Sequence, residues 1–302
     1  MSHSHLSFAG DRLPYSLNAS HLTSAFPSTY PFNVFAAGLT ELLQETDDVD
    51  VFRSVITTLE DSSFRFLAVC KVAYGFEEVE ALEREVGFYQ RELRHLQGKY
   101  IPRLFGYFVG TTVRGTTAAL VTSDEGRPLL KPFACLSLQF RKRVYRGLRR
   151  IHQAGVHHGD VLEANLVVRR RKDGSYWPMI VDFDRARKHE CEVKGKKTQI
   201  YGPCPEPGED VCFELYAIGG EEGLDIWRPK TAGFEGSWIP AEAVTDVNSA
   251  LESAAARGII SAKNLSPERS RMIAQRAVNY VHGWYDQRMK WDRSPESPLD
   301  DI

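Results

Sequence analysis

Two apolar runs separated by a short polar segment constrain the fold of this chain more than any other feature of its sequence. They are VDVFRSVITTL and FRFLAVCKVA, with EDSS between them, and both are rich in β-branched and aromatic residues. Such runs around a short polar segment predict a β-hairpin. A second pair of this kind, RLFGYFVG and TTAALVTS, follows later in the first half. We therefore predict an antiparallel sheet there.

One helix is predicted between the two hairpins, in the segment EEVEALEREVGFYQRELRHLQGKYIP. Its apolar residues recur at intervals of three and four positions, which places them on one face of a helix. Gly98 and Pro102 are expected to end this helix. The apolar face consists of Val79, Leu82, Val86, Tyr89, Leu93 and Leu96.

The second half of the chain changes from strand patterns to helical ones. LSLQFRKRVYRGLRRIHQAG is helical in pattern, and the polar loop HHGDVLEANLVV follows it. NLVVRR and PMIVDFD are predicted to form another hairpin around the turn Asp173-Gly174. Helical patterns return over residues 240–257 and 266–291, where Ser266 and Pro267 suit the start of a helix. The chain is therefore predicted to be α+β.

Composition and charge exclude several classes of protein. The formal net charge is −2, so the whole molecule is not electrostatically suited to nucleic acid or to an anionic membrane. No apolar run reaches the roughly 18–20 residues of a membrane-spanning helix. The basic runs RKRVYRGLRR and RRRK are interpreted as solvated surface rather than as a nucleic-acid site. With no secretory signal and no Cys-x-x-Cys pair, we expect a reducing, cytoplasmic setting. The oligomeric state stays open.

The order of these elements resembles the protein-kinase-like superfamily over roughly residues 33–220. AVCKV resembles the strand that carries the ATP-phosphate lysine of the family, and Lys71 matches that lysine. In the family a glutamate of the following helix pairs with this lysine. Glu85 falls at that place, although Glu78 or Glu92 would serve as well by spacing.

Two loop motifs strengthen the resemblance. HHGDVLEANLVV resembles the catalytic loop, in which His-x-Asp is followed by four residues and Asn, so Asp160 and Asn165 are matched. IVDFD resembles the metal-binding Asp-Phe-Gly motif, so Asp182 is matched. The His-Gly-Asp form of the loop, with Gly159, is also the form of aminoglycoside and choline phosphotransferases.

The resemblance implies a bilobal, protein-kinase-like fold. The N-lobe, residues 31–125, would be an antiparallel sheet with one helix, and the C-lobe, residues 126–292, would be mainly α-helical and shortened. A flexible N-terminal segment, residues 1–30, and a disordered tail, residues 293–302, would flank the two lobes.

The resemblance also implies an ATP- and magnesium-dependent phosphotransferase. Such an enzyme passes the γ-phosphate to a hydroxyl group on a protein or a small molecule. Asp160 would take the proton of that hydroxyl, and Lys71, held by Glu85, would contact the phosphates. Asn165 and Asp182 offer hard oxygen ligands for magnesium.

The adenine base would lie against the connector that follows the second hairpin. This connector, Val121 to Glu125 with Ser123 at its centre, would offer backbone groups to the base. Val69 and Val167 would form apolar walls on either side of it.

Two departures from the family pattern keep other functions open. The segment LLQETDDVDVFRSV stands where a phosphate-binding glycine loop is expected, and it contains no glycine but Asp47, Asp48 and Asp50. Asp184 replaces the usual glycine of Asp-Phe-Gly, which reduces backbone freedom or adds a metal ligand. One alternative is therefore a pseudokinase, a binding module with weak or no nucleotide binding. Another is a kinase-like fold recruited to a different nucleotide-dependent reaction.

Overall fold

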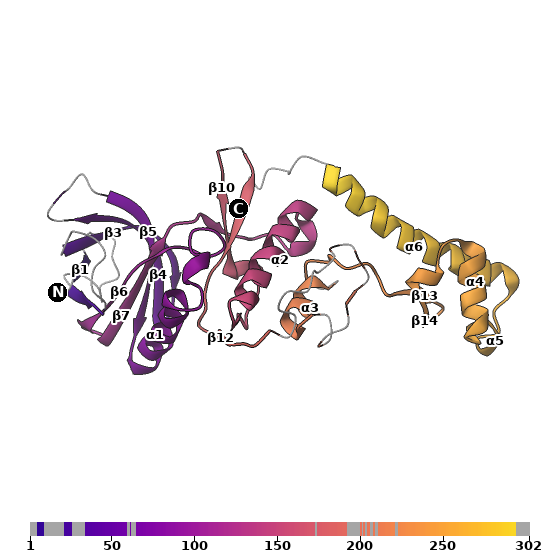
Figure 1. Ribbon diagram of the computed structural model, residues 1–302, viewed down its shortest axis with the longest axis horizontal. Helices are drawn as coiled ribbons and strands as arrows, with labels where there is room; N and C mark the ends of the chain where they lie inside the picture. The colour runs from indigo at the N-terminus through magenta and orange to yellow at the C-terminus, as the bar shows by residue number, and fades with distance from the viewer. Residues whose placement is uncertain are drawn as a thin grey trace. The chain divides into compact units, whose positions relative to one another are not determined.

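The computed structural model of this 302-residue chain divides into two compact units. Figure 1 shows its helices and strands. Unit 1 comprises Met1–Leu130 and Gly147–Glu190, and unit 2 comprises Lys131–Arg146 and Cys191–Ile302. The catalytic-type loop with Asp160 therefore lies in unit 1, whereas the resemblance assigns it to a second lobe; the bilobal division stays a prediction. The structure describes residues 5–8, 21–25, 34–58, 61, 65–172, 174–191, 200, 202, 204–205, 208, 211–220 and 223–293.

Unit 1 is built around a closed sheet, formed among the described residues by seven strands in the order β1-β2-β6-β7-β5-β4-β3. Both predicted hairpins are present, as β4–β5 and β6–β7. Neighbouring strands are antiparallel except β1 and β3, which pair in parallel. The strands are β1 His5–Phe8, β2 His21–Ser24, β3 Val34–Glu45, β4 Val49–Thr58, β5 Arg65–Tyr74, β6 Leu104–Thr112 and β7 Gly115–Ser123.

The strands β1 and β2 lie within residues 1–30, the segment expected to be flexible. The structure instead pairs them with β3 and β6, so they close the sheet. Their apolar residues Leu6, Phe8 and Leu22 are buried in its interior. Burial of these side chains, together with the pairing of two open sheet edges, explains why β1 and β2 form within a Ser- and His-rich stretch. The other residues of the segment, 1–4, 9–20 and 26–30, lie outside the described residues.

Side chains of β4 and β5 alternate between the interior of the closed sheet and its outer face. On β4, Phe52 and Ile56 point inward, and Asp50 is also buried, where its carboxylate accepts a hydrogen bond from the Tyr74 hydroxyl at 2.6 Å. On β5, Cys70 points inward. Burial raises the pKa of the Cys70 thiol to about 12, against a smaller lowering by Ser54. The neighbours of Cys70 on the other face, Val69 and Lys71, are therefore available to a ligand.

The helix α1, Phe76–Gln90, packs on the outer face of the sheet, against β5 and β7. Leu82 and Val86 form a small core with sheet residues there. The sequence predicted a helix up to Gly98, and that prediction is wrong after Gln90. Leu93 and Leu96 are buried as expected, but a 3₁₀ turn, Arg94–Leu96, carries Leu96. A three-residue turn satisfies the same apolar spacing as a helix, so the pattern cannot separate the two.

The rest of unit 1 carries the polar loop. The end of α2, Leu138–Gln153, leads to β9, Val156–His157, and then to a short 3₁₀ turn, Glu163–Asn165. The predicted hairpin after the loop is confirmed as β10, Leu166–Arg170, and β11, Tyr176–Ile180. Asp173 of its turn lies outside the described residues. β8, Arg127–Pro128, pairs with β10, and β12, Arg187–Lys188, pairs with β9.

Unit 2 is mainly helical. A hairpin that the sequence analysis missed, β13 Thr231–Phe234 and β14 Ser237–Pro240, packs with α4 and α6 around one apolar core. Ser266 caps α6 as predicted, because its hydroxyl accepts a hydrogen bond from the Arg269 amide at 3.2 Å. The helices are the start of α2, α3 Phe213–Gly219, α4 Val247–Ala256, α5 Ile259–Ala262 and α6 Pro267–Arg293.

The helices can be compared with two expectations from the sequence, that none spans a membrane and that residues 293–302 form a disordered tail. Within the described ranges, no helix combines the length and the apolar character needed to cross a membrane. Of the expected tail, residue 293 ends α6, and residues 294–302 lie outside the described residues.

Candidate active site

A cavity of about 310 Å³ in unit 1 brings together most of the residues that the sequence analysis selected. Strands β3, β4, β5 and β7, the helix α1 and the hairpin β10–β11 with its flanking loops contribute to its walls. Among the selected residues, seven line this cavity: Val69, Lys71, Glu85, Ser123, Asn165, Val167 and Asp182.

Lys71 is the central charge of the cavity. Its Nζ donates a hydrogen bond to Glu85 Oε2 at 2.9 Å and another to Asp182 Oδ1. The sheet register places Val51 and Leu120 beside Lys71 on the two neighbouring strands, so all three side chains share the cavity face. Residues from β5, α1 and the segment after β11 thus meet at one ammonium group.

The electrostatics of this group keep Lys71 charged. Burial lowers the pKa of Lys71, but the carboxylates of Glu85 and Asp182 outweigh it, and the net pKa is raised above its ordinary value. A raised lysine pKa contributes stability below the unfolded value of about 10.4, and that contribution is lost as pH rises through the folded pKa. The ion pairs therefore persist throughout the neutral range.

The structure selects Glu85 among the three glutamates that spacing left open. Its side chain is only 3% exposed, and its second oxygen, Oε1, accepts a hydrogen bond from the Phe183 amide at 3.2 Å. Glu85 therefore holds both the lysine and the backbone of the Asp-Phe-Asp segment. Glu92 lies instead 3.6 Å from Lys188 Nζ.

The loop with Asp160 is held by His158 and Asn165. His158 is buried, and its Nε2 donates to the Val181 carbonyl at 3.0 Å while Nδ1 accepts from the Asp160 amide at 3.3 Å. The Asn165 amide nitrogen donates to the Asp160 carbonyl at 2.8 Å and to its carboxylate at 3.2 Å. Asp160 is therefore fixed next to Asn165, although it is not among the cavity-lining residues.

Gly159 in this loop has a positive φ of 86°. A Cβ at this position would lie 2.7 Å from the Arg185 carbonyl oxygen, so a larger residue would push the two loops apart. The close approach explains the His-Gly-Asp form in this chain. It also brings the Arg185 guanidinium to 3.9 Å from the Asp160 carboxylate.

The oxygen atoms of Asn165, Asp182 and Asp184 fit a magnesium ion. All three residues line the cavity, and carboxylate and amide oxygens are the ligands that this ion prefers. Because the Asn165 nitrogen is used on Asp160, its Oδ1 is the atom that can bind a metal. Asp182 adopts a φ of 66°, a conformation that only a few residue types tolerate.

The connector after β7 is arranged differently from the prediction. β7 continues to Ser123, and Val121 points into the closed sheet, so the connector begins at Asp124. The Ser123 hydroxyl donates to Glu125 Oε1 at 2.7 Å. Arg53 on β4 holds the connector, because its guanidinium donates to the Asp124 carboxylate at 3.1 Å and to the Gly126 carbonyl at 2.6 Å.

Gly126 provides a test of this connector. It has a φ of 111°, and a Cβ there would lie 2.0 Å from the Val168 carbonyl oxygen. Gly115 has a similar φ of 91° with no atom within 4 Å of such a Cβ, so Gly115→Ala is a matched control. We expect Gly126→Ala to lower the free energy of unfolding by about 1–3 kcal/mol more than the control, measured by urea titration. If Gly126→Ala and Gly115→Ala lower the free energy of unfolding equally, the connector can move to accommodate the added Cβ at no cost.

The turn where a glycine loop was expected is closed by a side chain. Thr46 Oγ1 accepts hydrogen bonds from the amides of Asp48 at 3.3 Å and Val49 at 2.9 Å. Asp47 and Asp48 are exposed and do not line the cavity, and Asp50 faces the sheet interior. The carboxylates thus do not face the cavity, but the turn amides are already engaged by Thr46.

Several cavity residues were missed by the sequence analysis. Val49, Val51 and Arg53 alternate with the inward-facing residues of β4, and the two valines line the cavity. This two-residue period was visible in VDVFR, but it does not say which face a ligand meets. Leu43, Tyr89 and Leu120 also line the cavity, and they carried no separate signal.

Comparisons with known proteins find one partial similarity. No protein-family model matches the chain. Over 142 residues, 45% of this chain, it is 29% identical to the mitogen-activated protein kinase mpkC of Emericella nidulans. The matched segment spans 31% of the length of that relative. The similarity indicates, at most, a distant relationship with protein kinases.

Proposed function

We propose that this chain is an ATP- and magnesium-dependent phosphotransferase with a bilobal, protein-kinase-like fold. It would transfer the γ-phosphate of ATP to a hydroxyl group on a protein or a small molecule. The observation that carries the proposal is the set of contacts around Lys71, whose ammonium meets Glu85 and Asp182 inside one cavity. The partial similarity to a protein kinase supports the same class of chemistry.

The side chains divide the work of this mechanism, and Asn165 has two tasks. Lys71 binds the nucleotide phosphates, and Glu85 keeps its ammonium in the cavity. Asp160 orients the acceptor hydroxyl and takes its proton, while Asn165 holds the Asp160 carboxylate in place. Asn165 Oδ1, Asp182 and Asp184 would hold magnesium, which neutralises the developing phosphate charge when bound.

The base-binding end of the cavity supports a planar aromatic ligand. Val69 and Val167 line it from two different sheets, together with Val51 and Leu120. A cavity of about 310 Å³ whose lining combines apolar side chains with polar and charged ones falls in the size range of small-molecule sites. The connector held by Arg53 borders this end.

Thermal unfolding in the presence of ATP and magnesium tests nucleotide binding. A ligand at a concentration of about 100 times its dissociation constant adds about 2.7 kcal/mol to the free energy of unfolding. We therefore expect the melting temperature to rise by about 5–10 °C. Asp182→Asn should remove the magnesium-dependent part of the rise. Asp286→Asn, which changes an exposed carboxylate of α6, should retain it.

One observation favours a second function, a pseudokinase that binds partners rather than catalysing transfer. The Asp48 and Val49 amides donate to Thr46, so this turn has fewer backbone N–H groups available to bind phosphates than a glycine loop has. Absence of any rise in melting temperature at millimolar ATP with magnesium would contradict the enzyme and favour this alternative.

A further inference from the structure

Two cysteine thiols of unit 2 lie close together although they are distant in the sequence. The Sγ atoms of Cys191 and Cys212 are within 4.8 Å of one another. The Cys212 thiol is in hydrogen-bond contact with Cys191, and neither residue forms a disulfide in this structure. Neither residue lines the cavity of unit 1, so the proposed phosphotransfer does not use this pair.

The two thiols differ in their access to solvent. Cys191 is partly exposed, whereas Cys212 is buried and directly precedes the first residue of α3. Burial raises the pKa of the Cys212 thiol to about 11, although a hydrogen bond from the Leu215 amide lowers it in part. Because the thiolate is the reactive form, Cys212 reacts slowly with a dissolved oxidant at neutral pH. An oxidant in solution therefore reaches Cys191 first.

We propose that Cys191 and Cys212 form a redox site, which hydrogen peroxide converts into a disulfide. In the first step the Cys191 sulfur attacks a peroxide oxygen and the O–O bond breaks. A sulfenic acid forms, and the departing hydroxide leaves as water with the thiol proton. In the second step the Cys212 sulfur attacks the sulfenic sulfur, the S–O bond breaks, and the released hydroxide leaves as water with the Cys212 proton. Two thiols thereby pass two electrons to one peroxide.

The bond changes the covalent structure of unit 2. The two sulfurs must approach to about 2 Å, and a change of side-chain rotamer at the partly exposed Cys191 can supply this movement. The disulfide then closes residues 191–212 into a covalent ring. Such a ring restricts the unfolded chain more than the folded one, so the oxidised protein is the more stable form. Two equivalents of a small thiol reverse the reaction and are themselves oxidised to a disulfide.

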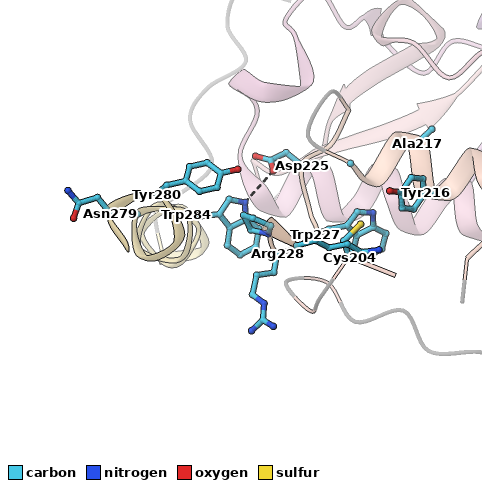
Figure 2. A pocket seen from close by; sticks show the side chains of 13 residues that line it. Cys204, Tyr216, Ala217, Asp225, Trp227, Arg228, Asn279, Tyr280 and Trp284 are labelled. Atoms are coloured by element: carbon cyan, nitrogen blue, oxygen red, sulfur yellow. Dashed lines mark hydrogen bonds between the residues drawn. The ribbon is translucent and has the colours of Figure 1, made fainter. Parts of the chain in front are cut away.

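Two other cysteines of unit 2 provide controls. Figure 2 shows Cys204 among the side chains that line a groove of about 670 Å³, and its Sγ donates to the Pro205 carbonyl at 3.8 Å. Cys135 is exposed to solvent. Both thiols can react with peroxide as well. The variants Cys204→Ser and Cys135→Ser therefore remove competing thiols and leave the proposed pair intact.

Thiol counting on the full-length protein tests the proposal. Reduced protein that is denatured and labelled with N-ethylmaleimide should carry five labels, one for each cysteine. Treatment with hydrogen peroxide before denaturation should leave two labels fewer, and tandem mass spectrometry should identify Cys191 linked to Cys212. The linked peptide should form at least about tenfold faster in folded protein than in urea, because the fold holds the two sulfurs close together. Cys204→Ser and Cys135→Ser should form the same linked peptide, and Cys191→Ser should form none.

Urea unfolding of the same samples provides a second readout. Oxidation should raise the urea concentration at the midpoint of unfolding by roughly 1 M, because the ring restricts the unfolded chain. Dithiothreitol should restore the lower midpoint. Cys191→Ser changes a partly exposed side chain, so it should fold normally, and peroxide should not raise its midpoint.

Two results would overturn the proposal. If peroxide gives no peptide that links Cys191 to Cys212, or links them to Cys204 or Cys135 equally fast, the contact between the two thiols is not a redox site. If the disulfide forms but the midpoint of unfolding does not rise, the bond distorts the fold and is not one that the structure accommodates. Neither result depends on nucleotide binding in unit 1.

Discussion

Asp160→Asn is expected to lower the rate of phosphoryl transfer by about 10²–10⁴-fold, the usual contribution of a general base. An amide cannot take the proton of the acceptor hydroxyl. It keeps the shape of the carboxylate and can still accept the hydrogen bond from the Asn165 amide nitrogen. Because Asp160 does not line the cavity, the affinity for ATP should stay unchanged.

ATP consumption with water or the protein itself as acceptor measures this effect without knowledge of the natural acceptor. Mass spectrometry of the products then separates phosphorylation from any other nucleotide-dependent reaction. Glu163→Gln is the matched control, because it removes another carboxylate of the same loop that, like Asp160, lies outside the cavity lining but has no part in the proposed proton transfer. Equal rates for wild type and Asp160→Asn would refute the mechanism.

Lys71→Met is expected to affect both activity and stability. Loss of the ammonium would remove the proposed contact with the phosphates, and removal of one such electrostatic group commonly lowers kcat by about 10²–10³-fold. It also leaves the Glu85 carboxylate, 3% exposed, without its cation. Breaking a buried ion pair in this way costs about 3–5 kcal/mol, which urea unfolding at neutral pH would measure.

The double variant Lys71→Met/Glu85→Gln separates these two effects. It removes the orphaned charge together with its partner, so much of the lost stability should return. Activity should not return, because the cation proposed to contact the phosphates is still absent. If Lys71→Met loses neither stability nor activity, the contacts of Lys71 with Glu85 and Asp182 have no functional part.

The local elements of unit 1 were largely predictable because their information is local. The β4–β5 and β10–β11 hairpins follow from β-branched runs around short polar segments. Lys71, Asn165 and Asp182 were selected through the resemblance of their strand and loops to motifs of the protein-kinase-like superfamily, because local pattern alone does not single them out. The apolar spacing also located α1, although it could not show that the helix stops at Gln90.

Contacts between residues distant in the chain could not be predicted in the same way. Closure of the sheet by β1 and β2 depends on burial of Leu6, Phe8 and Leu22. A strand of four residues is too short for its sequence pattern to predict that burial. The role of Arg53 at the connector depends on residues about seventy positions away.

The amino-acid order was therefore enough to specify hairpins, helices and the polar loops, since each arises from neighbours along the chain. Folding in three dimensions was needed to choose Glu85 over Glu78 and Glu92 and to direct Asp50 away from the cavity. Those choices depend on which faces of strand and helix meet. Spacing along the chain leaves them open, and packing of the sheet against α1 resolves them.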